Sequence, residues 1–135
     1  MTFNDAVYDL PNSLHDAELL GIRVDWSKRT VRLEFRVRSD NSSGVVERYE
    51  VAVLVEGLVF CSVESPARGS RFDPEGRAFI DTGEGFGLEE YRARLPEIPV
   101  GTFLQWIFVS QWNSYIHVCG ASAKVLTDIA SAGSD

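Results

Sequence analysis

Apolar and polar residues alternate most clearly in residues 30–38, TVRLEFRVR, where Arg and Glu separate the apolar positions. A period of two is typical of a β-strand that buries one face and leaves the other in water. Residues 18–26, ELLGIRVDW, repeat this pattern, with every second residue from Leu20 to Trp26 on the apolar face. The residues SKR between the two segments suit a tight connection, so we predict an antiparallel hairpin.

The middle of the chain predicts further strands, a loop and one helix. Residues 45–64, VVERYEVAVLVEGLVFCSVE, predict one long strand or two short ones, with Gly57 at a bulge or turn. Residues 65–78 are rich in Pro, Gly and charged residues, which is typical of a surface loop. Residues 88–95, LEEYRARL, predict a short helix, which has to end before Pro96.

The segment 102–126 is dominated by aromatic and β-branched residues. It favours two strands that turn near residues 111–114, and a helix over residues 102–112 is the weaker alternative. These elements together predict a single domain over residues 1–135 that is mainly β (α+β). Its architecture is expected to be a small antiparallel curved sheet or sandwich with one short helix.

Composition and charge narrow the class of protein. The 135 residues are 44% hydrophobic and 24% charged, which is ordinary for a globular domain and argues against disorder. The formal net charge of -7 disfavours binding to nucleic acid and suits a basic protein partner. Alternatively, the acidic balance only keeps the protein soluble.

The compartment is expected to be the cytoplasm. Cys61 and Cys119 lie in apolar runs, as reduced core cysteines do, and the N-terminus lacks the basic region of a signal peptide. Residues 98–123 contain no Asp, Glu, Lys or Arg, but they include several Gln, Asn, Ser and His positions. This favours a buried sheet over a membrane span, so we expect no membrane association.

Ser13, His15 and Asp16 have the residue types of a hydrolase triad. Neighbouring side chains of an extended chain point to opposite faces, so these residues cannot form the relay by themselves. His117 is the only other histidine, and no Gly-x-Ser-x-Gly motif presents a nucleophile. We therefore interpret His15 and Asp16 as structural residues that start the first strand, one of them by capping the backbone.

The sequence also lacks the usual motifs of metal and nucleotide sites. His117 and Cys119 would share a strand face, but there is no Cys-x-x-Cys or His-Glu-x-x-His. Glycines occur at 83, 85 and 87, yet Leu88 stands where a dinucleotide fingerprint has its third glycine, and Glu84 would repel a phosphate. We expect a tight turn before the helix, with no metal and no cofactor.

Acidic residues gather around the predicted helix, and aromatic residues gather near the last predicted turn. The acids form either a solvated face that favours the helix N-terminus or a patch that attracts a basic partner. The aromatic residues mark either the edge of the core or a binding hot spot. The candidate partner-binding residues are Asp81, Glu84, Glu89, Glu90, Trp112 and Asn113.

The stretch SLHDAELLGIRVDWSKRTVRLEFRV, residues 13–37, resembles the beginning of small bacterial proteins in which a Leu-His-Asp lead precedes a β-hairpin. These include immunity proteins of polymorphic toxin systems and several uncharacterised β domains. The resemblance covers about the first 40 residues and implies a non-enzymatic protein that binds and blocks a toxin. The recurring His and Asp of that group correspond to His15 and Asp16, without an implied catalytic role.

Three hypotheses follow for the function. The first is an immunity-like binding protein that blocks a basic protein partner. The second is a small-ligand-binding β domain or an enzyme that uses His15 or His117 as a base, which requires both histidines to meet in one pocket with a carboxylate. The third is a homodimeric structural module with a self-complementary apolar patch.

Overall fold

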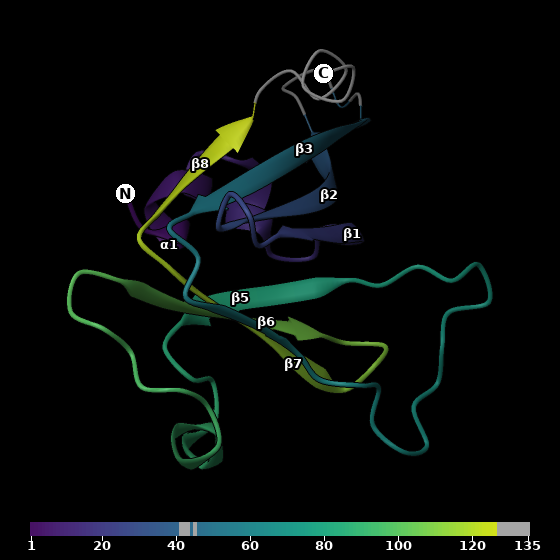
Figure 1. Ribbon diagram of the computed structural model, residues 1–135. Helices are drawn as coiled ribbons and strands as arrows, with labels where there is room; N and C mark the ends of the chain where they lie inside the picture. Colours follow the sequence, from purple (N-terminus) through teal and green to yellow (C-terminus); the bar gives the residue numbers. More distant parts are fainter. Residues whose placement is uncertain (41–43, 45, 127–135) are drawn as a thin grey trace.

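The computed structural model describes residues 1–40, 44 and 46–126, and these form two four-stranded antiparallel sheets (Figure 1). In the first sheet the strand order is β1 (Glu18–Asp25), β2 (Thr30–Asp40), β3 (Val46–Glu56) and β8 (Ser122–Leu126). In the second sheet the order is β4 (Phe60–Val63), β7 (Ser114–Gly120), β6 (Phe103–Val109) and β5 (Ile80–Glu84). The predicted mainly β class is confirmed.

The predicted hairpin is present as β1 and β2, which pair from Glu18↔Arg36 to Asp25↔Thr30. The Asp25 carboxylate closes the turn by accepting hydrogen bonds from the backbone of Ser27 and Lys28. The alternation predicted for β1 is wrong at its start, because a register shift between Leu19 and Gly21 inserts Leu20 as an extra residue. Such a bulge moves the apolar phase, so Leu19 packs against the core in place of Leu20.

The two sheets are joined where β3 continues into β4 beside the connection from β7 to β8. Gly57 turns the chain there with φ of 63°, and a Cβ on it would lie 2.6 Å from Ala121 Cβ. A Cβ on Gly120 would lie 2.4 Å from Val55 Cγ1. Glycine is required at this corner because two chain segments cross in contact, and the turn predicted at Gly57 is confirmed.

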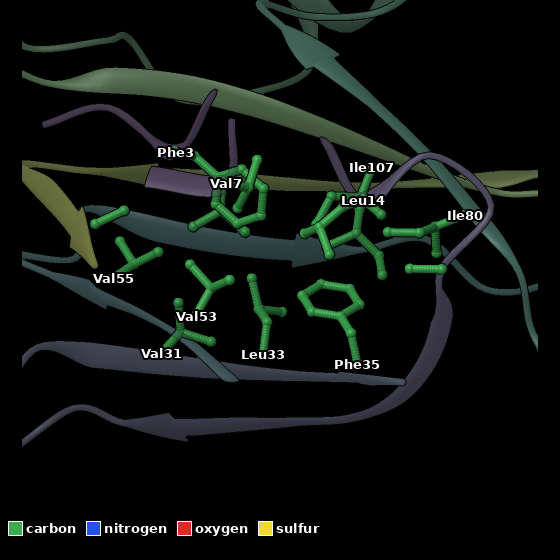
Figure 2. Close-up of a cluster of buried hydrophobic side chains, with 14 of the residues drawn as sticks. Phe3, Val7, Leu14, Val31, Leu33, Phe35, Val53, Val55, Ile80 and Ile107 are labelled. Atoms are coloured by element: carbon green, nitrogen blue, oxygen red, sulfur yellow. The ribbon is translucent and has the colours of Figure 1, made fainter. Parts of the chain in front are cut away.

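One apolar core lies between the sheets. Figure 2 shows the side chains of Val31, Leu33 and Phe35 pointing from β2 toward the opposite layer, and all three are 0% exposed. Ile80 of β5 and Ile107 of β6 belong to the same cluster. In β2 the alternation therefore has the expected result, with one apolar face turned inward.

Two short helices near the N-terminus complete the core, and neither is among the predicted elements. In helix α1 (Phe3–Val7), Phe3 and Val7 are buried, and the helix contacts β3, β6 and β8. The 3₁₀ helix η1 (Pro11–Leu14) buries Leu14 and contacts β2 and β5. Thr2 and Asp5 form a capping box at α1, a sequence signal that predicts a helix start.

The second half of the chain contains two predicted strands, a predicted loop and a predicted helix. β6 and β7 pair from Phe103↔Gly120 to Val109↔Ser114, which confirms two strands and makes the alternative helix over residues 102–112 wrong. The predicted loop over 65–78 connects β4 to β5. The helix predicted over 88–95 is a shorter 3₁₀ helix, η2 (Glu89–Ala93), seen as the green coil below the second sheet in Figure 1.

Candidate functional site

The outer face of the second sheet, turned away from the common core, carries a cluster of aromatic side chains. Register places Trp106 opposite His117 and Phe108 opposite Tyr115, so these four side chains share one face of β6 and β7. Ring centroids lie 5.0 Å apart for Phe108 and Tyr115 and 5.9 Å apart for Trp106 and Tyr115. This spacing is typical of favourable aromatic pairs.

The segment between β5 and β6 covers this face. Phe86, Leu95 and Ile98 pack against a second, smaller apolar cluster that contains Leu104 and Cys119. From the same segment, η2 places Tyr91 on the aromatic side chains, with ring centroids 4.6 Å from His117 and 5.3 Å from Tyr115. Part of the outer face is therefore buried under this segment, and the rest is accessible to solvent.

Glu64, just after β4, connects the cover to the sheet. Its carboxylate accepts hydrogen bonds from the hydroxyl of Tyr91 at 2.9 Å and from the backbone N–H of Tyr115 at 3.1 Å. Burial, followed by the hydrogen bond to Glu64, raises the pKa of Tyr91 to about 12. Tyr91 therefore stays protonated and donates to Glu64 throughout the physiological pH range.

His117 lies beneath Tyr91 and is 1% exposed. Its Nε2 lies 2.6 Å from the carbonyl oxygen of Phe86, and because a carbonyl oxygen can only accept, Nε2–H is the donor. Burial lowers the pKa of His117, because desolvation disfavours the imidazolium form. A neutral, buried imidazole whose proton is bound to a backbone carbonyl holds the covering segment in place.

A cleft of about 660 Å³ opens beside this network. We call it the aromatic cleft; its aromatic and charged lining includes Glu64, Glu90, Tyr91, Arg94, Phe108 and Tyr115. The Arg94 guanidinium lies over the Tyr91 ring, 4.8 Å from Cζ to the centroid, and its Nη2 is 3.7 Å from Glu64 Oε2. The cleft therefore already accommodates a cation between an aromatic face and a carboxylate.

Two of the six candidate partner-binding residues, Glu90 and Asn113, line the aromatic cleft. The other three acidic candidates, Asp81, Glu84 and Glu89, do not line this cleft. Asp81 contacts His15, and Glu89 forms an ion pair with Arg92 at 2.8 Å. Glu84 is exposed at the end of β5, three residues after Asp81, so the two side chains point to opposite faces of the strand.

Trp112 and Asn113 lie in the turn between β6 and β7. Trp112 is partly buried and packs against the main core, which corresponds to the core-edge alternative. Asn113 is exposed and adopts a φ of 48°, a conformation that asparagine tolerates better than most residues. Of this pair, only Asn113 lines the cleft.

His15 and Asp16 lie directly before β1. The backbone N–H of Asp16 donates to the carbonyl of Ile80 at 2.8 Å, and Ile80 N–H donates to Ala17 at 2.9 Å, so this turn is tied to β5. The imidazole of His15 contacts the carboxylate of Asp81 through Nδ1, and not the backbone that a capping residue would reach. His15 and His117 therefore lie in separate places and have separate partners.

The two cysteines are reduced and lie in the second sheet. Cys61 and Cys119 are free thiols on neighbouring strands, and burial raises the pKa of Cys61 to about 11. Within residues 1–40, 44 and 46–126, no group of three or more His, Cys, Asp or Glu side chains is placed to hold a metal ion. In the same part of the chain, no helix has the length and apolar character needed to cross a membrane.

Comparisons with protein-family models, with curated proteins and with solved structures found no match to this chain.

The predicted site residues do not include Glu64, Tyr91 and Arg94, which define one wall of the aromatic cleft. Tyr91 lies in the predicted helix, but its partner Glu64 is 27 residues away along the chain. No local pattern connects these positions, because the contact depends on how the covering segment folds back over β4 and β7.

Proposed function

We propose that this chain is a non-enzymatic binding protein, of the immunity-like kind, which blocks a basic protein partner at the aromatic cleft. The observation that carries the proposal is the composition of the cleft, where Tyr91, Tyr115 and Phe108 lie next to Glu64 and Arg94. Tyrosine and arginine are enriched at the energetic centres of protein interfaces, since they combine a large apolar surface with hydrogen-bonding groups.

The charge around the cleft supports a basic partner. Residues 84–97, which include the lining residues Glu90, Tyr91 and Arg94, carry four exposed carboxylates, at Glu84, Glu89, Glu90 and Glu97, against two arginines. Both arginines already have acidic neighbours, because Arg92 pairs with Glu89 and Arg94 with Glu64. The lining itself is balanced, with Glu64 and Glu90 against Arg68 and Arg94. The excess of negative charge lies in the segment beside the cleft, where it accelerates association with a positively charged surface.

The enzymatic hypothesis has less support. A histidine base needs access to a substrate, but His117 is 1% exposed and its Nε2 proton is bound to the carbonyl of Phe86. His15 contacts Asp81 at a different cleft. The two histidines do not combine into one catalytic arrangement.

The proposal is tested by expressing each gene adjacent to this one in a host cell, with and without this protein. We expect one neighbour to be toxic and the toxicity to be relieved by co-expression. The purified complex should weaken as salt is added, because exposed charges are screened. Toxicity that this protein does not relieve, or neighbours without toxicity, would contradict the immunity function.

Variants then test the aromatic cleft as the binding surface. Glu90→Lys reverses an exposed charge inside the cleft. Glu47→Lys makes the same change at an exposed position of β3, in the other sheet. We expect Glu90→Lys to weaken binding by about tenfold, since a like charge then faces the basic partner, with little effect of Glu47→Lys. Equal effects of the two variants would exclude this cleft as the docking surface.

A further inference from the structure

A second cleft, of about 840 Å³, lies where the start of β1 and the end of β2 meet the segment leading into β5. We call it the arginine cleft, because Arg36, Arg38, Arg48 and Arg77 line it, while its carboxylates are those of Asp16 and Glu18. The chain has 13 Lys and Arg residues and a net charge of -7. The fold therefore concentrates nearly a third of its positive side chains in one cavity of an acidic protein.

Strand pairing creates this concentration. Arg36 and Arg38 lie on the polar face of β2, and register places Arg48 of β3 directly opposite Arg38. Like charges that face each other across two strands are unfavourable. Arg38 and Arg48 are both exposed, so one anion from solution can reach both guanidinium groups.

The arginines differ in how far neighbouring carboxylates already neutralise them. Arg36 lies 3.3 Å from both Glu18 and Glu50, and Arg77 forms an ion pair with Asp73 at 3.1 Å. Arg48 has no ion-pair partner among the residues that the structure describes. Of these three arginines, Arg48 is consequently the one whose charge no described carboxylate neutralises.

The rest of the cleft is larger and less polar than a bare ion requires. Half-buried Phe79 contributes apolar surface to it. The Gln111 side chain accepts a hydrogen bond from Phe79 N–H at 2.7 Å and so fixes the backbone on this side. A cavity of this size is in the range of sites for small organic ligands.

We propose that the arginine cleft binds a phosphorylated small molecule, with its phosphate on Arg38 and Arg48 and its organic part against Phe79. A phosphate carries up to two negative charges and three acceptor oxygens, so it can bind two guanidinium groups at once. One arginine fork already satisfies a carboxylate, which makes a carboxylic acid the weaker fit to paired arginines. This proposal is independent of protein binding at the aromatic cleft.

Isothermal titration calorimetry at low salt with inorganic phosphate, pyrophosphate and adenosine 5′-monophosphate tests the proposal. We expect at least one probe to bind, and Arg48→Gln to weaken that binding by about tenfold, the effect of losing a hydrogen bond between charged groups. Arg23→Gln is the matched control. Arg23 faces Arg32 in another like-charged pair of the same sheet, is exposed and lies outside the cleft.

Three results would overturn the proposal. The first is that none of the probes binds at millimolar concentration. The second is that Arg23→Gln weakens binding as much as Arg48→Gln, which would indicate nonspecific attraction. The third is that adenosine without phosphate binds as well as the monophosphate. Circular dichroism and thermal unfolding establish that both variants are folded.

Discussion

The hydroxyl of Tyr91 lies 2.9 Å from both carboxylate oxygens of Glu64, and this contact joins η2 to the end of β4. Tyr91 is 6% exposed, although it belongs to a short 3₁₀ helix whose other residues are exposed. Because a 3₁₀ turn of this length has little stability of its own, the buried tyrosine holds it on the sheet. The aromatic cleft owes one of its walls to this pair.

Tyr91→Phe tests the contact directly. The variant keeps the ring between His117 and Tyr115 but removes the donor to Glu64. We expect a loss of about 1.5–3 kcal/mol in the free energy of unfolding, the usual contribution of a hydrogen bond to a charged group. Urea denaturation measures it. Tyr8→Phe is the control, because Tyr8 is 74% exposed, and equal stability losses in the two variants would show that the bond to Glu64 contributes nothing.

Stability at alkaline pH should depend on Cys61. Burial raises its pKa from 9.0 to about 11, so the native thiol keeps a proton that the unfolded chain releases. The unfolded state therefore binds fewer protons between pH 9 and 11, and stability falls as the pH rises through this window. The loss from this group should reach roughly 2–3 kcal/mol near pH 11.

Cys61→Ala removes this contribution. Urea unfolding in the presence of a reductant, from pH 8 to 11, should show a smaller loss of stability in the variant than in the wild type. Parallel curves over the whole range would contradict a raised thiol pKa. The comparison uses the difference between the two proteins, so other groups that titrate in the same window cancel.

His117 should make the protein less stable in mild acid. Its pKa is lowered by burial from 6.5, so the unfolded chain takes up a proton at a pH where the native imidazole remains neutral. The unfolded state then binds more protons, and stability falls as the pH decreases below about 6.5. His117→Gln retains a donor for the carbonyl of Phe86 but does not titrate.

Between pH 7 and 5, the unfolding free energy of the wild type should therefore fall more than that of His117→Gln. An NMR titration of the His117 ring gives a separate readout, since its resonances should stay those of the neutral form below pH 6.5. Protonation of His117 in the folded protein at or above pH 6.5 would refute the prediction.

Local patterning predicts much of this fold because alternation directly reports which face of a strand is buried. Leu33 and Phe35 are core residues as their positions indicate, and Arg36 and Arg38 point outward. The prediction fails at Leu20, because a bulge breaks the one-to-one pairing on which alternation depends. It also fails at Val24 and Trp26, which the pattern assigns to the apolar face but which are 40% and 56% exposed.

The clefts are harder to predict than the strands. The arginine cleft needs the register that sets Arg48 opposite Arg38, and the aromatic cleft needs Tyr91 to meet Glu64 across a long connection. Both depend on tertiary pairing, which no hydrophobic period encodes. The acidic residues attract notice in the sequence because they are close together there, yet alternation along β5 sends Asp81 and Glu84 to opposite faces.

Gly83 of β5 should be intolerant of any side chain. It pairs with Trp106, and a Cβ at position 83 would lie 2.4 Å from Trp106 Cζ2. Gly83→Ala therefore has to displace an indole that is packed against Tyr115, which we expect to cost about 1–3 kcal/mol, as overpacking usually does. Displacement of Trp106 should also change the intrinsic tryptophan fluorescence of the folded protein.

Gly21→Ala is the matched control, since Gly21 is likewise a strand glycine without positive φ. The atom nearest to its added Cβ would be Glu34 Oε2 at 3.9 Å, an ordinary contact. Alanine there should leave stability unchanged or raise it by up to about 1 kcal/mol, since it reduces the freedom of the unfolded chain. If urea denaturation finds the two variants equally stable, the indole does not rest on Gly83 as described. If Gly83→Ala alone is destabilised, the close approach of Trp106 accounts for the glycine.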